Sequence, residues 1–181
     1  MAGNLVSKSR AERFEETVLP CLDAAYNLAR WLTRNEHDAQ DVVQESYLRA
    51  LQAFDTFQLG REARPWLLKI VRNTCYSWLR KNRPSKATAQ FDESARDAPK
   101  SHSDPETSLL EKANSQVVRE ALEQASLEYR EVLILRELEG LSYREIAEII
   151  DIPLGTVMSR LSRGRKELRD RLNENAGEVS R

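Results

Sequence analysis

Apolar residues recur every three or four positions along most of this chain, the spacing that places side chains on one face of an α-helix. The first such run spans Ala11 to Thr33 and contains Pro20, which we expect to kink or split the helix. The second run spans His37 to Phe54 and opens with acidic residues suited to a helix N-terminus. Its predicted buried stripe is Val42, Val43, Tyr47, Leu48, Leu51 and Phe54.

Another side of the His37–Phe54 helix carries carboxylate and amide side chains. These are Asp38, Asp41, Gln44 and Glu45. Exposed charges of this kind are either ordinary solvated surface or a docking edge that meets a basic partner. The pattern alone leaves both interpretations open.

A third helical run follows a predicted loop at Asp55–Arg64, which contains Gly60. It begins near Pro65, a residue that suits a first helical turn, and continues to Lys81. Its apolar face includes Trp66 and Trp78, which we expect to be core residues. Basic, amide and aromatic residues fill the rest, namely Arg64, Lys69, Arg72, Asn73, Tyr76, Arg80, Lys81 and Arg83. Proteins that bind single-stranded nucleic acid typically supply cations for its phosphate backbone and planar groups that stack on its bases.

The segment Pro84–Glu106 has no hydrophobic period and is rich in Ser, Ala, Pro and charge, which predicts a flexible linker. Two further helices are expected at Thr107–Ala125 and Leu127–Leu138, with Gly140 as a helix C-cap. Their predicted packing residues are Val117, Val118, Ala121, Leu122, Val132, Leu133, Leu135 and Leu138.

Two short helical patterns then meet at a tight turn. Ser142 and Glu145 form a capping-box pattern, and the first helix stops before Pro153. The second helix has an apolar side of Val157, Leu161, Leu168 and Leu172. Its opposite side carries Gly155, Ser159, Ser162, Arg163 and Lys166. Small residues beside long basic ones, on the second of two crossing helices, predict a helix-turn-helix that reads the DNA major groove.

The predicted fold class is therefore all-α, with two small helical domains joined by a flexible linker. The expected boundaries are an N-terminal domain at 1–83, a linker at 84–106, and a C-terminal helix-turn-helix domain at 107–181. A length of 181 residues with 40% hydrophobic residues is enough for two packed cores.

The net charge of −1 hides an uneven distribution of charged residues along the sequence. Residues 61–83 contain seven basic residues and one acidic residue, and residues 154–171 contain six basic and two acidic. Residues 84–141, between them, contain seven basic and twelve acidic residues. The two basic islands are suited to phosphate binding through counterion release.

Cys21 and Cys75 lie inside apolar patterns, so we expect reduced core thiols in a cytoplasmic, nucleoid-associated protein. No run of residues is apolar and long enough to suggest membrane insertion. An enzyme is one alternative, because His37 and Asp38 are similar to a metal-dependent phosphohydrolase dyad, to which Asp41 and Glu45 could add ligands. The other histidine, His102, lies in the linker, so we expect no metal, no cofactor and no catalysis.

Three motifs in order resemble the extracytoplasmic-function sigma factors of the sigma-70 family, which belong to bacterial RNA polymerase. DAQDVVQE at 38–45 resembles the polymerase-docking helix of that family. RPWLLKIVRNTCYSWLRK at 64–81 resembles its promoter −10 region, and SYREIAEIIDIPLGTVMSRLSRGRKEL at 142–168 its −35 helix-turn-helix. The similarity runs from about Phe14 to Leu172, except in the linker.

The resemblance implies a role for each motif. Asp38, Asp41, Gln44 and Glu45 would bind the clamp helices of the largest polymerase subunit. The loop at Thr56–Arg64 would capture a flipped base of the non-template strand, with Asn73 behind it. The implied −10 contacts are Arg61, Arg64, Lys69, Arg72, Asn73, Tyr76 and Arg80. The implied −35 contacts are Thr156, Ser159, Arg160, Ser162, Arg163 and Lys166.

The resemblance also implies partners, namely core RNA polymerase, promoter DNA and an anti-sigma factor that covers the polymerase-binding surfaces. Met158 stands where some relatives carry a base-reading arginine, so the resemblance does not define the −35 sequence. An ordinary helix-turn-helix regulator is the second alternative, and it would bind duplex DNA without polymerase. The separate basic and aromatic helix at Arg64–Arg83 counts against it, because a ligand-sensing domain has no need of one.

Overall fold

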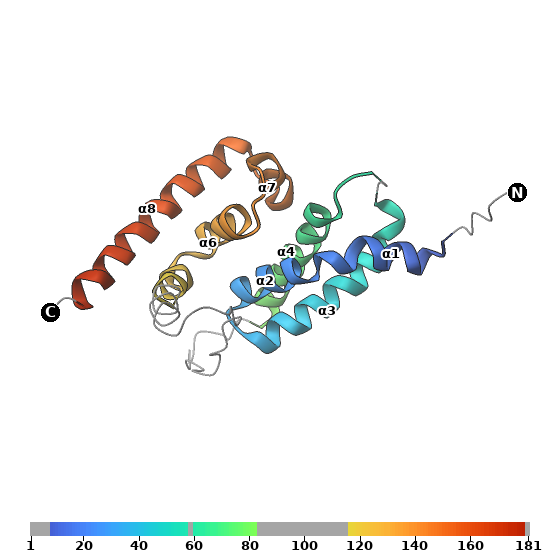
Figure 1. Ribbon diagram of the computed structural model, residues 1–181, viewed down its shortest axis with the longest axis horizontal. Helices are drawn as coiled ribbons and strands as arrows, with labels where there is room; N and C mark the ends of the chain where they lie inside the picture. The colour runs from blue at the N-terminus through green and yellow to red at the C-terminus, as the bar shows by residue number, and fades with distance from the viewer. Residues whose placement is uncertain (1–7, 58–59, 83–115, 180–181) are drawn as a thin grey trace, which may run out of the picture.

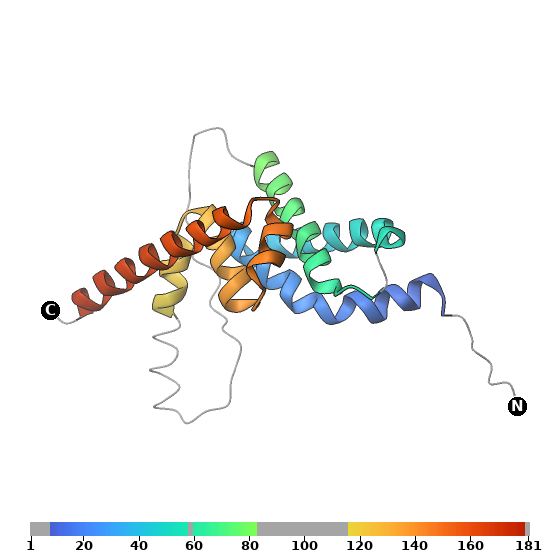
Figure 2. The ribbon, with the colours of Figure 1, turned by 90° about the horizontal axis from the view of Figure 1, so that it is seen from above.

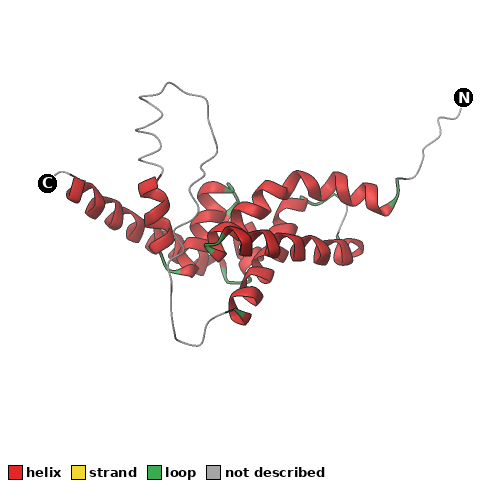
Figure 3. Ribbon diagram, turned by 90° about the horizontal axis from the view of Figure 1, so that it is seen from below, coloured by secondary structure: helices red, strands yellow, loops and turns green. Residues whose placement is uncertain are grey.

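The computed structural model describes residues 8–57, 60–82 and 116–179, with side chains up to residue 173 in the last range. Helices make up its regular structure, and Figure 3 shows no strand among these residues. The all-α fold class is therefore confirmed. The predicted linker at 84–106 and the first part of the helix expected at 107–125 lie outside the described residues.

The first helical run is split at Pro20, as its sequence predicts. α1 (Arg10–Val18) begins with a capping box between Ser9 and Glu12. A short 3₁₀ turn, η1 (Leu19–Cys21), then leads into α2 (Leu22–Thr33). Proline lacks the backbone N–H that a continuous α-helix needs, so the α-helix is interrupted at this turn.

α3 (Glu36–Ala53), the 3₁₀ turn η2 (Phe54–Thr56) and α4 (Ala63–Lys81) complete the N-terminal helices. α2, α3 and α4 pack pairwise around a core that includes Leu28, Val42 and Leu67. The side chains of Trp66 and Trp78 are partly buried against this core. One member of the predicted buried stripe is wrong, because Leu48 is 58% exposed on α3.

The C-terminal helices begin with a helix over 116–124 and continue with α6 (Leu127–Leu133), α7 (Tyr143–Ile150) and α8 (Leu154–Val179). The helix expected at Leu127–Leu138 keeps α geometry only to Leu133 and then widens into the π-helical turn η3 (Ile134–Leu138). Gly140 follows with a φ of +67°, as expected of a C-cap glycine.

Two predicted packing residues of the C-terminal helices are in fact exposed. Val118 is 39% exposed and Leu138 is 52% exposed. The π turn shifts the angular position of every residue after Leu133, so a 3.6-residue period cannot place Leu138 correctly. Ala121, Leu122, Val132, Leu133 and Leu135 are buried as predicted.

The two groups of helices pack against each other, and α6 lies between α8 and the N-terminal helices (Figures 1 and 2). α6 contacts α2, while α7 contacts α4. Arg130 of α6 is only 4% exposed and donates to the carbonyl oxygens of Leu122, Glu123 and Ala125. Its Nη1 also donates across the boundary to the carbonyl of Trp31, at 3.2 Å.

Arg130 should therefore be a major contributor to the stability of the C-terminal helices. Arg130→Met keeps the buried length but leaves four carbonyl oxygens without their donor, so we expect a loss of about 3 kcal/mol in the free energy of unfolding. Urea denaturation measures this loss. Arg144→Met, at an exposed position of α7, is the matched control, and an equal loss in both variants would contradict the assignment.

Candidate polymerase and nucleic-acid interfaces

The acidic patch of α3 faces away from the helical core. Asp41, Gln44 and Glu45 are exposed, and Asp38 is half-buried at the first turn. Asn35 caps this turn by accepting the backbone N–H of Asp38 at 3.0 Å. Glu45 pairs with Arg49 at 2.7 Å, one turn along the same helix. The structure thus brings together the four residues predicted for this surface.

Leu48 belongs to the same surface, although its sequence position suggested burial. It follows Gln44 by four residues and Glu45 by three, so it lies beside both on the helix. Leu48 is 58% exposed, so it adds apolar area to the polar surface of α3. In the sequence, the spacing of Leu48 from Gln44 and Glu45 is as consistent with a place in the acidic patch as with a place in the core stripe.

The residues predicted to bind the −10 element are divided into exposed and engaged residues. Lys69, Asn73 and Arg80 of α4 are exposed, and so is Arg61, which precedes the helix. Three other predicted −10 residues, Arg64, Arg72 and Tyr76, instead contact carboxylates of the C-terminal helices. Arg64 pairs with Glu139 near Gly140.

Glu131 of α6 is completely buried between the two groups of helices. Arg72 Nε donates to Glu131 Oε1 at 2.7 Å, and the Tyr76 hydroxyl donates to Oε2 at 3.2 Å. The Arg72 guanidinium also lies over the Tyr76 ring, 4.2 Å from its centroid. One buried carboxylate therefore binds two residues of the basic face.

This environment holds both partners of Glu131 in their hydrogen-donating forms. Burial, reinforced by the negative charge of Glu131, raises the pKa of Tyr76 to about 12. Burial alone would lower the pKa of Arg72, but the hydrogen bond and charge of Glu131 more than offset it, so the pKa is raised. The phenol stays protonated and the guanidinium stays charged at neutral pH.

A cleft of about 510 Å³ lies where the loop before α4 meets α7. One side of the cleft is lined by Thr56, Phe57, Arg61, Glu62, Pro65, Trp66 and Lys69. The centroids of the Phe57 and Trp66 rings are 5.1 Å apart, so the two rings pack against each other. The other wall is acidic and consists of Glu145 and Glu148 with Ile149.

The helix-turn-helix forms as the capping pattern predicts. Ser142 and Glu145 make both hydrogen bonds of the capping box at the start of α7. Asp151 ends α7 in the left-handed region, with a φ of 61°, and Pro153 precedes α8. Val157 and Leu161 are buried, which directs the opposite face of α8 outward.

The outward face of α8 carries most of the predicted −35 residues. Ser159, Ser162, Arg163 and Lys166 are exposed, and so is Met158, at 53%. Thr156 is half-buried. Arg160 lies at the edge of this face, with its side chain 25% exposed and paired with Glu128 at 3.0 Å. In this conformation the Arg160 guanidinium is therefore engaged within the C-terminal helices.

Gly164 is a structural residue that the sequence reasoning missed. It is buried in the middle of α8, and a Cβ at this position would lie 3.2 Å from the Leu133 and Tyr129 side chains. The missing side chain lets α8 approach α6 closely. A glycine inside a helical pattern is the signal that predicts such an approach.

Both cysteines have free thiols. Burial raises the pKa of the Cys75 thiol to about 12, and it also raises the pKa of the half-buried Cys21. Within the described residues, no cluster of three His, Cys, Asp or Glu side chains is arranged to hold a metal ion. In the same part of the chain, no helix combines the length and hydropathy needed to span a membrane.

Two family models match the chain, sigma-70 region 2 over residues 18–85 and sigma-70 region 4 over residues 115–168. The chain is 32% identical over 167 residues to the ECF RNA polymerase sigma factor SigE of Mycolicibacterium smegmatis, which covers 92% of this chain and 64% of that protein. It therefore spans just under two thirds of SigE. It is 37% identical over 137 residues to the ECF RNA polymerase sigma-E factor of Salmonella typhimurium, with 72% of each covered.

Among solved structures, the chain is similar to the sigma factor RpoE in its complex with the anti-sigma factor NepR from Bartonella quintana. The TM-score is 0.74 at 29% identity, and the match covers 89% of this chain and 97% of that one. Coverage of this extent includes both groups of helices.

The capping box makes the stability of the helix-turn-helix dependent on pH. The side-chain and backbone hydrogen bonds with Ser142 lower the pKa of Glu145 in the folded state. The stabilisation is therefore present above the unfolded pKa and is lost as the pH falls through the folded pKa. Ser142→Ala should cost about 1 kcal/mol near pH 7 and less near pH 3, as measured by urea denaturation. Ser162→Ala is the control, and a pH-independent cost at Ser142 would contradict this account.

Proposed function

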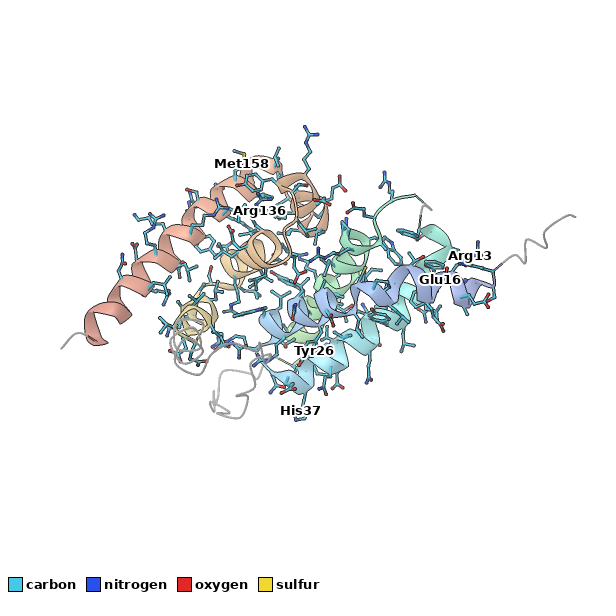
Figure 4. The ribbon with its side chains drawn as sticks, in the orientation of Figure 1. Arg13, Glu16, Tyr26, His37, Arg136 and Met158 are labelled. Atoms are coloured by element: carbon cyan, nitrogen blue, oxygen red, sulfur yellow. The ribbon has the colours of Figure 1, made fainter. Side chains whose placement is uncertain are left out.

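The chain belongs to the extracytoplasmic-function sigma factors, and we propose that it binds core RNA polymerase and directs promoter-specific transcription initiation. The observation that supports this proposal is that one chain carries three separate surfaces, the acidic patch of α3, the basic face of α4 and the outward face of α8. In Figure 4, His37 at the start of α3 and Met158 on α8 lie on opposite sides of the molecule. A protein built in this way can contact the enzyme while presenting other faces to the promoter.

The α3 patch would dock on the clamp helices of the largest polymerase subunit. Asp41, Gln44 and Glu45 supply hydrogen-bond acceptors on an exposed helix face, and Asp38 completes the patch at its first turn. Leu48 adds apolar area next to them. Carboxylates around an apolar contact suit a partner with basic rims, where charge complementarity sets the orientation of docking.

The basic face of α4 and the adjoining cleft would bind the −10 element as separated strands. Arg61, Arg64, Lys69, Arg72 and Arg80 supply cations for the backbone, while Tyr76 and Asn73 supply a stacking plane and an amide. A base flipped into the cleft beside Trp66 would stabilise the melted duplex. Opening of the DNA is then driven by binding, and the protein performs no catalytic step of its own.

The outward face of α8 would read the −35 element in the major groove. Ser159, Ser162, Arg163 and Lys166 are placed for bases or phosphates, with Thr156 and Arg160 at the margins. We further propose that residues 1–83 and 107–181 are the two functional domains, joined through residues 84–106. Such a protein would act in the cytoplasm, at the nucleoid.

An anti-sigma factor is also part of the proposal. RpoE of Bartonella quintana, to which this chain is similar, forms a complex with such a factor. An ordinary regulator would bind duplex DNA without polymerase. The α3 patch and the basic face of α4 favour a sigma factor, because a regulator that acts alone has no use for either surface.

Reversal of charge on α3 tests polymerase docking. Asp41→Arg with Glu45→Arg should abolish binding to core polymerase without loss of folding, because both side chains are exposed. Pull-down with core polymerase measures binding, and circular dichroism measures folding. Glu15→Arg with Glu120→Arg is the control, since it makes the same charge change at exposed sites outside the patch. Undiminished binding by the α3 variant would remove the docking assignment.

Arg163→Ala tests −35 reading. If the guanidinium reads a base, the holoenzyme should lose about 1–3 kcal/mol of binding free energy on its own promoter and little on a promoter altered at that base. Fluorescence anisotropy with both DNA sequences measures the difference. Arg169→Ala, at an exposed site further along α8, is the control. An equal loss on the two sequences would identify a phosphate contact instead.

A further inference from the structure

Another cavity, of about 590 Å³, lies between the two groups of helices. It is lined by the end of α2, the last turns of α4 and the start of α6, and α2 packs against both of the other helices (Figure 1). A volume of this size is typical of pockets that hold small ligands. Among the described residues, the lining includes Arg34, Arg80 and Arg130 but no Asp or Glu.

Arg130 brings a buried positive charge to the wall of this cavity. Four of its five N–H groups donate to carbonyl oxygens, two from Nη2 and one each from Nε and Nη1. The fifth N–H, on Nη1, has no acceptor among the described residues. In that part of the chain, no carboxylate forms an ion pair with this guanidinium. Arg130 therefore offers the cavity one unused donor and an unpaired charge.

Arg34 adds a second positive charge at the same cavity. Burial, reinforced by the charge of Arg34, lowers the pKa of Arg130 to about 10, and the opposing effect of the Glu123 carboxylate is smaller. Two like charges beside one cavity are unfavourable until an anion compensates both. The electrostatics of the cavity therefore favour a negatively charged ligand.

The backbone at Arg34 also points to a role for its side chain. Arg34 ends α2 in the left-handed region, with a φ of 61°. Glycine would end the helix in this conformation without steric cost, so the backbone gives no reason for an arginine. Arg34 and Arg80 are exposed, whereas Arg130 is buried. The first two therefore lie on the solvent side of the cavity and the third on its inner wall.

Three leucines supply the apolar part of the lining. Leu32 is buried, and Leu79 and Leu127 are half-buried. Small-molecule sites typically combine apolar walls with a few convergent polar groups. The arrangement therefore suits a ligand with an anionic end and an organic body.

We propose that this cavity binds a small diphosphate ester, the chemical class that includes the nucleoside diphosphates. Arg34 and Arg80 bind the phosphate oxygens as bidentate donors, and the unused N–H of Arg130 adds a third contact. Two bidentate arginines together require more oxygens than one phosphate group exposes, which favours a diphosphate. The organic body of the ligand packs against the leucines.

The residues that define this site differ from those of the predicted DNA surfaces. Tyr76 and Arg80 line the cavity and are also predicted −10 residues, but Arg34 and Arg130 belong to neither DNA surface. A test through Arg34 therefore leaves every predicted DNA contact unchanged. It needs neither polymerase nor promoter, so its failure would leave the proposed function intact.

Isothermal titration calorimetry of the full-length protein with adenosine diphosphate tests the site. We expect saturable binding at one site per chain, and Arg34→Gln should weaken it about tenfold, because a charge-assisted contact to phosphate is lost. Arg13→Gln is the matched control, since it makes the same charge change at an exposed position of α1 that does not line the cavity (Figure 4). It should bind as the unsubstituted protein does, and circular dichroism measures the folding of both variants.

Pyrophosphate and adenosine, titrated separately, divide the ligand into its two parts. Both should bind more weakly than adenosine diphosphate. Adenosine that binds as tightly overturns the role of the arginines, whereas pyrophosphate that binds as tightly supports the anion site and overturns the need for an organic body.

Two results overturn the site itself. One is the absence of saturable binding, and the other is an equal loss in Arg34→Gln and Arg13→Gln, which indicates general attraction to the charge of the protein. If Arg34→Gln does not fold, Arg80→Gln decides by the same titration, because Arg80 is exposed in the last turn of α4.

Discussion

Burial of two opposite charges at neighbouring positions of α6 determines how the molecule is assembled. Arg130 and Glu131 are both withdrawn from water, and each needs compensating partners in a fixed geometry. Arg130 donates to three carbonyl oxygens within the C-terminal helices and to the carbonyl oxygen of Trp31. Glu131 accepts hydrogen bonds from two residues of α4. Apolar contacts bring α6 to the boundary, but these polar contacts select one register.

Because Arg130 and Glu131 have different hydrogen-bond partners, substitutions at the two positions should have different effects. Most hydrogen bonds of Arg130 lie within the C-terminal helices. The hydrogen bonds of Glu131 instead cross the boundary between the two groups of helices. Arg130 therefore stabilises the C-terminal helices, whereas the adjacent Glu131 joins them to the N-terminal helices. A substitution at one of them need not produce the effect of a substitution at the other.

Much of the fold was predictable because its signals are local. Pro20 split the first helix, and the Ser142–Glu145 capping box began α7 where the pattern indicated. Periodicity failed at Leu48, because an exposed apolar residue can have the same helical spacing as one in the core. It failed at Leu138 because the preceding π turn changes the period itself. The candidate site was predictable as three surfaces, but the engagement of Arg72 by Glu131 was not, since no local pattern links residues 59 positions apart.

Run-off transcription with core polymerase, with and without this protein, on fragmented DNA of the source bacterium, tests the central claim most directly. The account predicts discrete new start sites that appear only when both proteins are present and that share a −35 and a −10 element. It is contradicted if no new transcripts appear while the protein alone binds duplex DNA, which is the behaviour of an ordinary helix-turn-helix regulator.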